Sequence, residues 1–234
     1  EDENVWAVNF SKVGEIKSID SLQIFRESLK KVLLSMDGVE DVTYSSINYP
    51  YSGNGYNTAI KVNGAETWAN FYTTEDNYEN VLGMHVLEGR WFTEADKVSN
   101  IRPAVINATL KKKLFGEDGA LGKIVESEAT PQRMRIVGVV ADTKDESEAE
   151  VPGPALFQRM DTSDMRFPYS ILIKVKAGAN AALESRMHKT LSNTMKNADV
   201  DIEQLTQKKE AQNRKMLVPK IIFFSIAGFL IINV

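Results

Sequence analysis

Few side chains in this sequence have the types and spacing that chemistry requires. The 234 residues include two histidines, His85 and His188, and no cysteine. A metal site needs several histidine, cysteine or carboxylate ligands at defined spacing, and two distant histidines do not supply one. The close carboxylate pairs are Glu94/Asp96, Glu126/Glu128 and Asp142/Asp145. None of them approaches the spacing of a calcium-binding loop, so we interpret them as solvated faces or turns.

Motifs for nucleophilic catalysis and for phosphate binding are also missing from the sequence. It contains no G-x-S-x-G elbow and no Walker-type phosphate loop. Gly53-Asn54-Gly55 begins like a dinucleotide-binding loop, but Thr58 stands where the third glycine belongs. We interpret this stretch as a turn between subdomains. The sequence therefore predicts no catalytic residue, no metal and no cofactor, and the protein is not expected to be an enzyme.

Two loops are the candidate binding surfaces. The segment Asp142 to Pro154 (DTKDESEAEVPGP) is acidic and almost devoid of apolar residues, which predicts an exposed loop. Tyr49, Tyr51 and Tyr56 are expected to form an exposed aromatic loop. Turns beside a sheet edge, however, often carry such residues for structural reasons. Loops carry function more often than sheets do. The candidate partner contacts are Tyr51, Tyr56, Asp142, Asp145 and Glu146.

The charge of the chain and its apolar tail indicate the surroundings in which it works. A net charge of −4 argues against a nucleic-acid binder, which usually has a basic surface. No residue from Ile221 to Val234 is charged. This run is shorter than the ~20 residues that span a bilayer, and it resembles the first part of a transmembrane helix that continues beyond residue 234. A buried core helix is the alternative, but such a helix usually keeps a polar stripe.

The elements that must position these residues follow from hydrophobic periodicity. The pattern at both chain ends predicts β-α-β units. Apolar and polar residues alternate along each predicted strand, and each predicted helix has one apolar face. The predicted N-terminal unit is strand 5–10, a helix capped by Asp20-Ser21 and running to Met36, and strand 39–47. The predicted C-terminal unit is strand 169–176, a helix capped by Asn180, and strand 199–205, followed by a polar helix that Thr206 caps.

The middle of the chain has a different residue pattern, in which short predicted strands are separated by glycine and asparagine. Strands are predicted at 58–62, 67–72, 84–88, 103–107, 123–127 and 134–140, with one short helix at 108–115. The expected fold class is α+β. Residues 1–53 and 165–218 would form a membrane-proximal, ferredoxin-like split β-α-β subdomain. Residues 54–164 would form an inserted, mostly β subdomain, and 219–234 would begin a transmembrane helix.

One series of motifs goes beyond generic patterning. It consists of Gly89–Asp96 (GRWFTEAD), Pro103–Asn107 (PAVIN), Leu110, Lys113–Gly116 (KLFG), Leu121–Lys123 (LGK) and Ile136–Asp142 (IVGVVAD). In order and spacing this series resembles the extracytoplasmic core domain of MacB-like permeases, the FtsX-like family of ABC transporters. The physical roles we expect for its residues are structural. Gly89 turns the chain, Trp91 and Phe92 fill the core of the insert, Thr93 caps a turn, and Gly138 allows close packing.

The resemblance implies a mechanical role at the cell membrane. In such permeases one membrane helix precedes this domain and three follow it, so the domain lies on the extracytoplasmic, periplasmic side. A basic cluster before the tail, from Lys208 to Lys220, would favour a cytoplasmic location, but large translocated domains need not obey the charge rule. The implied partners are an ABC ATPase subunit that hydrolyses the ATP, a second permease copy, the membrane, and a periplasmic substrate or partner protein.

Two other classes of function remain open at this point. One is a membrane-tethered sensor or binding module that has no ATPase partner. The other is a soluble extracytoplasmic enzyme with a C-terminal anchor, which would need a deep pocket lined by convergent polar groups. The sequence contains no motif that indicates such a pocket.

Overall fold

The computed structural model describes residues 4–11, 19–144, 151–161, 170–195 and 199–215. The strands are β1 Val5–Ser11, β2 Val39–Ser45, β3 Asn57–Val62, β4 Ala65–Thr74, β5 Val86–Gly89, β6 Arg102–Asn107, β7 Ile124–Ser127, β8 Thr130–Val140, β9 Ala155–Arg159, β10 Ser170–Val175 and β11 Asp199–Gln204. The helices are α1 Ile19–Leu34, α2 Tyr78–Leu82, the 3₁₀ helix η1 Glu94–Val98, α3 Ala108–Phe115 and α4 Ala181–Thr194. A further helical segment, 205–215, follows β11 directly. The chain is thus a mixed α+β protein.

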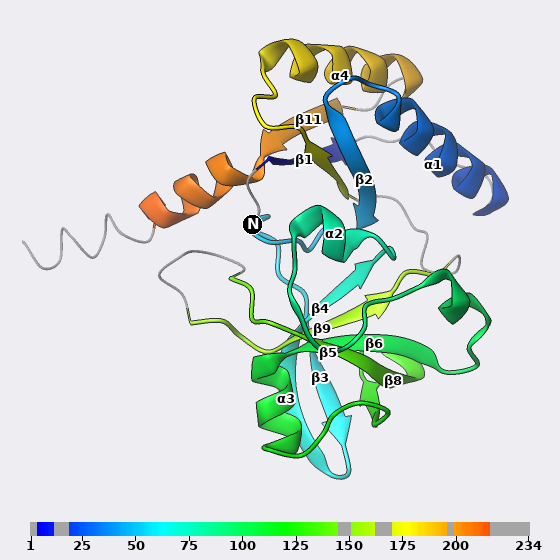
Figure 1. Cartoon of the computed structure of the whole chain (residues 1–234), viewed down its shortest axis with the longest axis vertical. Helices are drawn as coiled ribbons and strands as arrows, with labels where there is room; N and C mark the ends of the chain where they lie inside the picture. Colours follow the sequence, from blue (N-terminus) through cyan, green and yellow to red (C-terminus); the bar gives the residue numbers. More distant parts are fainter. Residues whose placement is uncertain (1–3, 12–18, 145–150, 162–169, 196–198, 216–234) are drawn as a thin grey trace, which may run out of the picture.

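Within the described residues the strands form one continuous sheet whose two ends differ in origin (Figure 1). At one end the order is β11-β1-β10-β2, and every neighbouring pair there is antiparallel. Strands from both chain ends therefore alternate in space. The rest of the sheet consists of β3 to β9, and β4 pairs with β9 in parallel. The two ends meet through a single β2–β4 pair, Ser45 with Thr74, so the sheet is nearly interrupted there.

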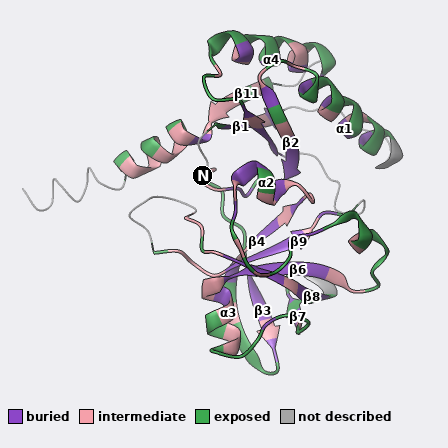
Figure 2. Ribbon diagram, viewed as in Figure 1, coloured by how far each residue is buried: buried purple, intermediate pink, exposed green. Residues whose placement is uncertain are grey.

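The alternation of apolar residues along β1 explains how this strand is covered on both faces. Trp6, Val8 and Phe10 point into a core that the apolar faces of α1 and α4 close. Val5 and Ala7 point to the opposite face and join a second core. Because side chains alternate along a strand, β1 is buried on both faces, and Figure 2 colours this strand largely purple.

Three apolar clusters account for the packing of the whole described chain. The first lies under α1 and α4, and the third lies in the insert under α3. The second, which we call the central core, contains residues of both parts: Val5, Leu172 and Leu205 pack with Tyr72 and Phe157. The central core therefore joins the two ends of the sheet where strand pairing is weakest.

Trp91 and Phe92 belong to this central core, with 5% and 4% of their surfaces exposed. The expectation that they fill the core of the insert is confirmed, and their cluster also includes residues of β1 and β10. Burial of such large rings stabilises a fold strongly. The motif pair thus holds the insert against the strands from the chain ends.

Most of the predicted elements are present within one to three residues, and the departures lie at helix starts and in the insert. The helix α1 begins at Ile19, before the predicted cap at Asp20-Ser21. Helix 205–215 begins one residue before Thr206, so Thr206 is not its cap. Asn180 is confirmed as the N-cap of α4, because its side chain accepts hydrogen bonds from the backbone of Ala182 and Leu183. Sequence reasoning missed β9 and α2.

Gly89 and Gly138 are confirmed as a turn position and a close-packing position. Gly89 has φ +68°, and a Cβ there would lie 2.3 Å from the carbonyl oxygen of Val137. At Gly138 a Cβ would lie 2.1 Å from the carbonyl oxygen of Arg90. The backbone at the end of β5 therefore approaches its antiparallel neighbour β8 so closely that neither glycine position has room for a Cβ atom.

Membrane-spanning structure is not found in the described part of the chain. No helix there has both the length and the apolar character needed to cross a bilayer. The predicted membrane segment 219–234 lies outside the described residues.

Candidate functional site

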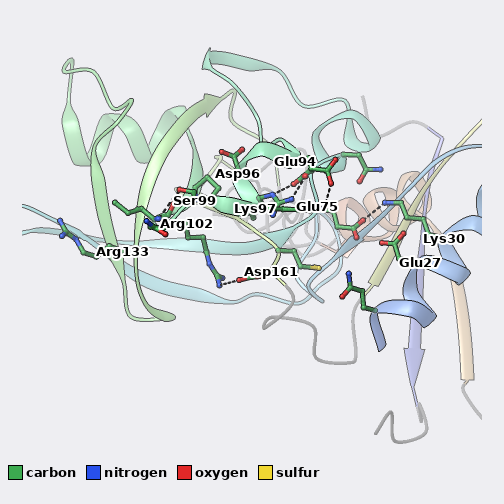
Figure 3. A pocket seen from close by; sticks show the side chains of 18 residues that line it. Glu27, Lys30, Glu75, Glu94, Asp96, Lys97, Ser99, Arg102, Arg133 and Asp161 are labelled. Carbon is green, nitrogen blue, oxygen red and sulfur yellow. Dashed lines mark hydrogen bonds and ion pairs between the residues drawn. The ribbon is translucent and has the colours of Figure 1, made fainter. Parts of the chain in front are cut away.

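A wide cleft in the described structure lies where α1 faces the insert. It has a volume of about 1100 Å³ and is bordered by α1 on one side and by η1, the start of β6 and the end of β9 on the other (Figure 3). Its charged side chains are six acidic and five basic: Glu27, Glu75, Asp76, Glu94, Asp96, Asp161, Lys30, Lys97, Arg102, Arg133 and Arg159. We call it the charged cleft. Because the two signs nearly balance, the cleft has many ion pairs but little net charge.

Glu75, in the turn between β4 and α2, links three elements. Its carboxylate accepts hydrogen bonds from Lys30 at 2.9 Å and from the backbone N–H of Tyr44 at 3.0 Å. It also lies 3.4 Å from Arg26 Nη2, whose side chain is 3% exposed. Figure 3 shows Lys30 reaching across from α1 to this carboxylate. One acidic side chain of the insert thus contacts both α1 and β2.

Asp76 and Asn77, the two residues after Glu75, add further contacts between the insert and the strands from the chain ends. Asp76 forms a bidentate ion pair with Arg159 of β9, with N–O distances of 2.6 and 2.7 Å. Asn77 donates to the side chain of Asp41 at 2.8 Å and to the carbonyl of Val42 at 3.0 Å. Bidentate arginine–carboxylate pairs are directional as well as strong. We call Glu75, Asp76 and Asn77 the junction triplet, because it connects α1 and β2 with β9.

Arg26 is a buried cation held by several groups at once. Its guanidinium carbon lies 4.1 Å above the ring of Tyr44, and Nη2 lies 3.0 Å from the sulfur of Met160. The Tyr44 hydroxyl donates to the carbonyl of Arg26 at 3.1 Å. Burial raises the pKa of Tyr44, so this ring stays neutral. A cation on a ring face with a carboxylate at its edge is a stable arrangement for a buried arginine.

The motif Gly89–Asp96 builds one wall of the charged cleft through a second bidentate pair. Arg90 donates to Asp96 at 2.7 and 2.8 Å. Asp96 also accepts from the backbone N–H of Thr93 at 2.9 Å, which closes the capping box of η1. The Arg90 guanidinium is the main cause that lowers the pKa of Asp96. The expected capping role of Thr93 is therefore confirmed.

The predicted tyrosine surface is largely internal. Tyr49 and Tyr51 are 2% and 5% exposed, so the expectation that they form an exposed aromatic loop was wrong. The hydroxyl of Tyr49 exchanges hydrogen bonds with Asn9, and Tyr51 packs beside the central core. Tyr56 is 52% exposed and leans edge-on against Phe71. Among these tyrosines, Tyr56 is the one whose side chain a partner can reach.

Asp142 is exposed as predicted, but its carboxylate is engaged within the protein. It accepts hydrogen bonds from the backbone N–H of Thr109 at 2.9 Å and from the Thr109 hydroxyl at 2.8 Å. The side chain thereby satisfies donors in the first turn of α3. The other two acidic candidates, Asp145 and Glu146, lie outside the described residues.

A second, smaller cavity brings two of the predicted positions together. It has a volume of about 300 Å³, and both Tyr51 and Asp142 line it, together with Lys209 of helix 205–215. We call it the aromatic cavity because rings of Tyr72, Tyr78 and Phe157 also line it. Tyr56 does not take part. Two loops that are about ninety residues apart in the sequence thus meet at one site.

The titratable side chains of the charged cleft are arranged mainly as ion pairs between different elements. Within the described residues there is no group of three or more histidine, aspartate or glutamate side chains that could hold a metal ion. His85 and His188 are both exposed and lie on different elements. The charged cleft is instead organised as paired charges that hold one element against another.

Comparison of the chain with known proteins identifies its family. The model of the MacB-like periplasmic core domain matches residues 3–190. This chain belongs to that family. The family resemblance carried by the GRWFTEAD to IVGVVAD series is thereby confirmed, as is the class of protein, an ABC transporter permease.

Relatives with curated names share between a quarter and a third of their aligned residues with this chain. It is 30% identical over 118 residues to the macrolide export ATP-binding/permease protein MacB of Aggregatibacter actinomycetemcomitans, covering 50% of this chain and 16% of that protein. It is 27% identical over 145 residues to the uncharacterised ABC transporter permease YknZ of Bacillus subtilis, covering 60% and 34%. The matched segments therefore span at most about a third of the relatives' length.

Solved structures share the fold with this member of the MacB-like periplasmic core domain family. The periplasmic region of MacB from Actinobacillus actinomycetemcomitans superposes with a TM-score of 0.63 at 19% identity, covering 90% of this chain and 92% of that one. The extracellular domain of YknZ gives a TM-score of 0.56 at 19% identity, covering 83% and 99%. The sheet-rich α+β fold is thus that of extracytoplasmic permease domains.

Two residues that organise this domain were missed by sequence reasoning. Asn107 accepts from the N–H groups of Leu110 and Ala155, both at 2.9 Å, and donates to the carbonyl of Gly153 at 2.8 Å. It therefore caps α3 and anchors the start of β9. Its place just before a predicted helix was a usable signal for the cap. No local sequence signal indicated the role of Glu75, because its three partners lie in α1 and β2, about 30 to 50 residues away in the sequence.

Proposed function

We propose that this chain is the extracytoplasmic domain of an ABC transporter permease subunit, and that it carries ATP-driven motion of the membrane helices to a periplasmic substrate or partner. The observation that supports this most is the joint between β11 and helix 205–215. Leu205, the first residue of the helix, is fully buried in the central core. A helix whose first residue is buried in a core moves with that core.

A polar network strengthens the same joint. Lys208 of the helix forms an ion pair with Glu203 of β11. Asn9 of β1 donates to the Tyr49 hydroxyl at 2.9 Å and lies 3.4 Å from Glu203, and it accepts from Ser170 of β10 at 2.8 Å. These contacts tie the helix to three strands of the sheet. Displacement of the helix would therefore be passed to the sheet rather than absorbed by a loop.

We further propose the division of the chain into moving parts. Residues 1–53 and 165–218 would form the membrane-proximal subdomain, a split β-α-β unit, and residues 54–164 the insert beyond it. The single β2–β4 pair between them supports this division. The junction triplet and the central core would transmit force across it, because rigid contacts pass motion between packed units.

The rest of the proposal concerns segments and partners beyond the described residues. Residues 219–234 would begin a membrane helix, and a first membrane helix would precede residue 1. An ABC ATPase would drive these helices, and a second permease copy would pair with the first through them. Tyr56 and the acidic loop from Asp142, with Asp145 and Glu146, remain the candidate contacts for a periplasmic partner.

A topology experiment tests the proposed location. Residues 1–234 contain no cysteine, so Lys112→Cys on the exposed face of α3 provides a single reporter thiol once any cysteine elsewhere in the full-length protein is replaced by serine. We expect a membrane-impermeant maleimide to label it in intact, outer-membrane-permeabilised cells as completely as in lysed cells. Labelling that requires lysis would place the domain in the cytoplasm and refute the proposal.

A second experiment separates a transporter subunit from a tethered sensor that has no ATPase partner. The full-length protein is purified under mild conditions, and its membrane complex is assayed for ATPase subunits and for vanadate-sensitive ATP hydrolysis. We expect a nucleotide-binding subunit, or a fused nucleotide-binding domain, in stoichiometric amount. A complex without either would favour the sensor function.

A further inference from the structure

We propose that the aromatic cavity is a binding site for a compact apolar or aromatic molecule that carries an acidic group. The inference goes beyond the proposed transport function, because binding at this cavity does not require that the domain moves. The cavity's volume of about 300 Å³ lies at the lower end of the range of small-molecule sites. Its occupant would therefore be smaller than a typical drug.

The floor of the cavity is a group of packed rings. Tyr72 and Phe157 are stacked with their centroids 4.8 Å apart, and Tyr78 lies 6.2 Å from Phe157. Leu82 and Met84 complete the apolar surface. Rings held in place by a core have little side-chain entropy to lose on binding. Such a floor suits a flat or aliphatic group of the ligand.

Among the described residues, the rim of the cavity carries more positive than negative side chains. Lys144 and Lys209 both line it, and Lys209 Nζ lies 5.8 Å from the centroid of the Tyr51 ring. His85 also contributes to the rim. The carboxylate that lines it, Asp142, is hydrogen-bonded to Thr109. An acidic group of the ligand would thus meet two ammonium groups at the mouth while its apolar part reaches the rings.

The walls come from six separate parts of the fold. They are the loop before β3, strand β4, α2 with the turn after it, the residues that follow β8, strand β9 and helix 205–215. The backbone of Tyr51 has φ +61°, a left-handed conformation that is uncommon for a side chain of this size. The Tyr51 ring lines the cavity beside Lys209. A ligand here would contact the insert and helix 205–215 simultaneously.

The test uses the whole chain in lipid nanodiscs with ¹³C-labelled methionine methyl groups. The probes are 4-phenylbutyrate, 4-phenylbutylamine and 4-phenylbutanol, which share a phenylalkyl group and differ in charge. Met84 lines the cavity, whereas Met187 is buried in the cluster under α1 and α4, so its methyl signal is an internal control. The Met84 signal is assigned with Met84→Leu.

We expect 4-phenylbutyrate to shift the Met84 signal saturably, in the millimolar range for a fragment of this size, and to leave Met187 unchanged. Lys144→Gln combined with Lys209→Gln should weaken binding about three- to tenfold, whereas Lys112→Gln on α3 should not. Thr143→Trp, which narrows the mouth from outside the core, should abolish the shift while the Met187 signal reports an intact fold.

Three results would overturn the inference. The first is the absence of a saturable shift at Met84 with any probe. The second is an equal response at Met84 and Met187, which would indicate nonspecific binding or partition into lipid. The third is tighter binding of the amine than of the acid, which would contradict the charge of the proposed ligand. None of these outcomes bears on the membrane topology, so the proposed function can fail or hold independently.

Discussion

Replacement of Glu75 by alanine is the sharpest perturbation of the junction between the two parts of the sheet. The carboxylate serves three donors: the ammonium of Lys30, the guanidinium of Arg26 and the backbone N–H of Tyr44. Glu75→Ala removes all three contacts and leaves the strand pairing intact. We therefore expect a loss of stability without a change of fold.

The magnitude follows from the burial of each partner. Lys30 is 21% exposed and its ion pair is worth about 0.5–1 kcal/mol. Arg26 is 3% exposed but keeps its contacts with Met160 and the ring of Tyr44, so we assign about 1 kcal/mol to its loss. The partly buried N–H of Tyr44 loses an acceptor, which costs about 1 kcal/mol. The expected destabilisation is about 3 kcal/mol.

Urea unfolding followed by tryptophan fluorescence measures this loss. Trp6 and Trp91 are buried in different clusters, so the signal reports on both parts of the chain. Glu75→Gln, which keeps an acceptor for Tyr44 but no charge, should be destabilised by about half as much. Glu126→Ala, whose side chain is 65% exposed, is the matched control and should change stability by less than about 0.5 kcal/mol. Equal stability of Glu75→Ala and Glu126→Ala would refute the reasoning.

Three further predictions test other parts of the account. Gly138→Ala should destabilise the protein by at least about 3 kcal/mol in urea unfolding, because its Cβ would meet the Arg90 carbonyl at 2.1 Å, whereas Gly119→Ala, with nothing within 4 Å, should be nearly neutral. Asn107→Ala should cost about 2–4 kcal/mol by the same assay, because two buried N–H groups and one partly buried carbonyl lose their partner. Asp96→Asn should be less stable than the native protein near pH 7. The lowered pKa of Asp96 gives a stabilisation that is complete above the ordinary value of 3.8 and is lost as the pH falls through the lowered value, so a stability difference that persists unchanged at about pH 2 would contradict it.

Local patterns in the sequence predicted those features whose cause is local. Asn180 caps α4 because the asparagine and the donors it satisfies are neighbours in sequence. Thr93 and Asp96 form a capping box for the same reason. The sequence predicted that Gly89 and Gly138 are glycines for backbone reasons. The close approach of β5 and β8 that requires them is visible only in the structure. Most strand positions followed from alternation of apolar residues.

The features that the sequence did not predict depend on contacts between distant segments. Tyr51 lies in a polar, glycine-rich turn, yet it is 5% exposed and lines a cavity together with residues of β9, α2 and helix 205–215. Strand β9 is five residues long and pairs with both β4 and β6, which a single-sequence pattern cannot reveal. The central core likewise draws on both ends of the chain and on the insert, so Trp91 and Phe92 were assigned to a smaller cluster than the one they fill.

The central claim is that helix 205–215 and the strands from the chain ends move as one body when the transporter hydrolyses ATP. Spin labels at Gln207→Cys and Lys189→Cys, placed on the helix and on α4, report the distance within this body in the full-length, reconstituted transporter. Labels at Lys112→Cys in two copies report the distance between their inserts. We expect nucleotide to change the distance between copies and to leave the distance from helix 205–215 to α4 unchanged. A nucleotide-dependent change from helix 205–215 to α4, with a constant distance between the inserts, would contradict the account.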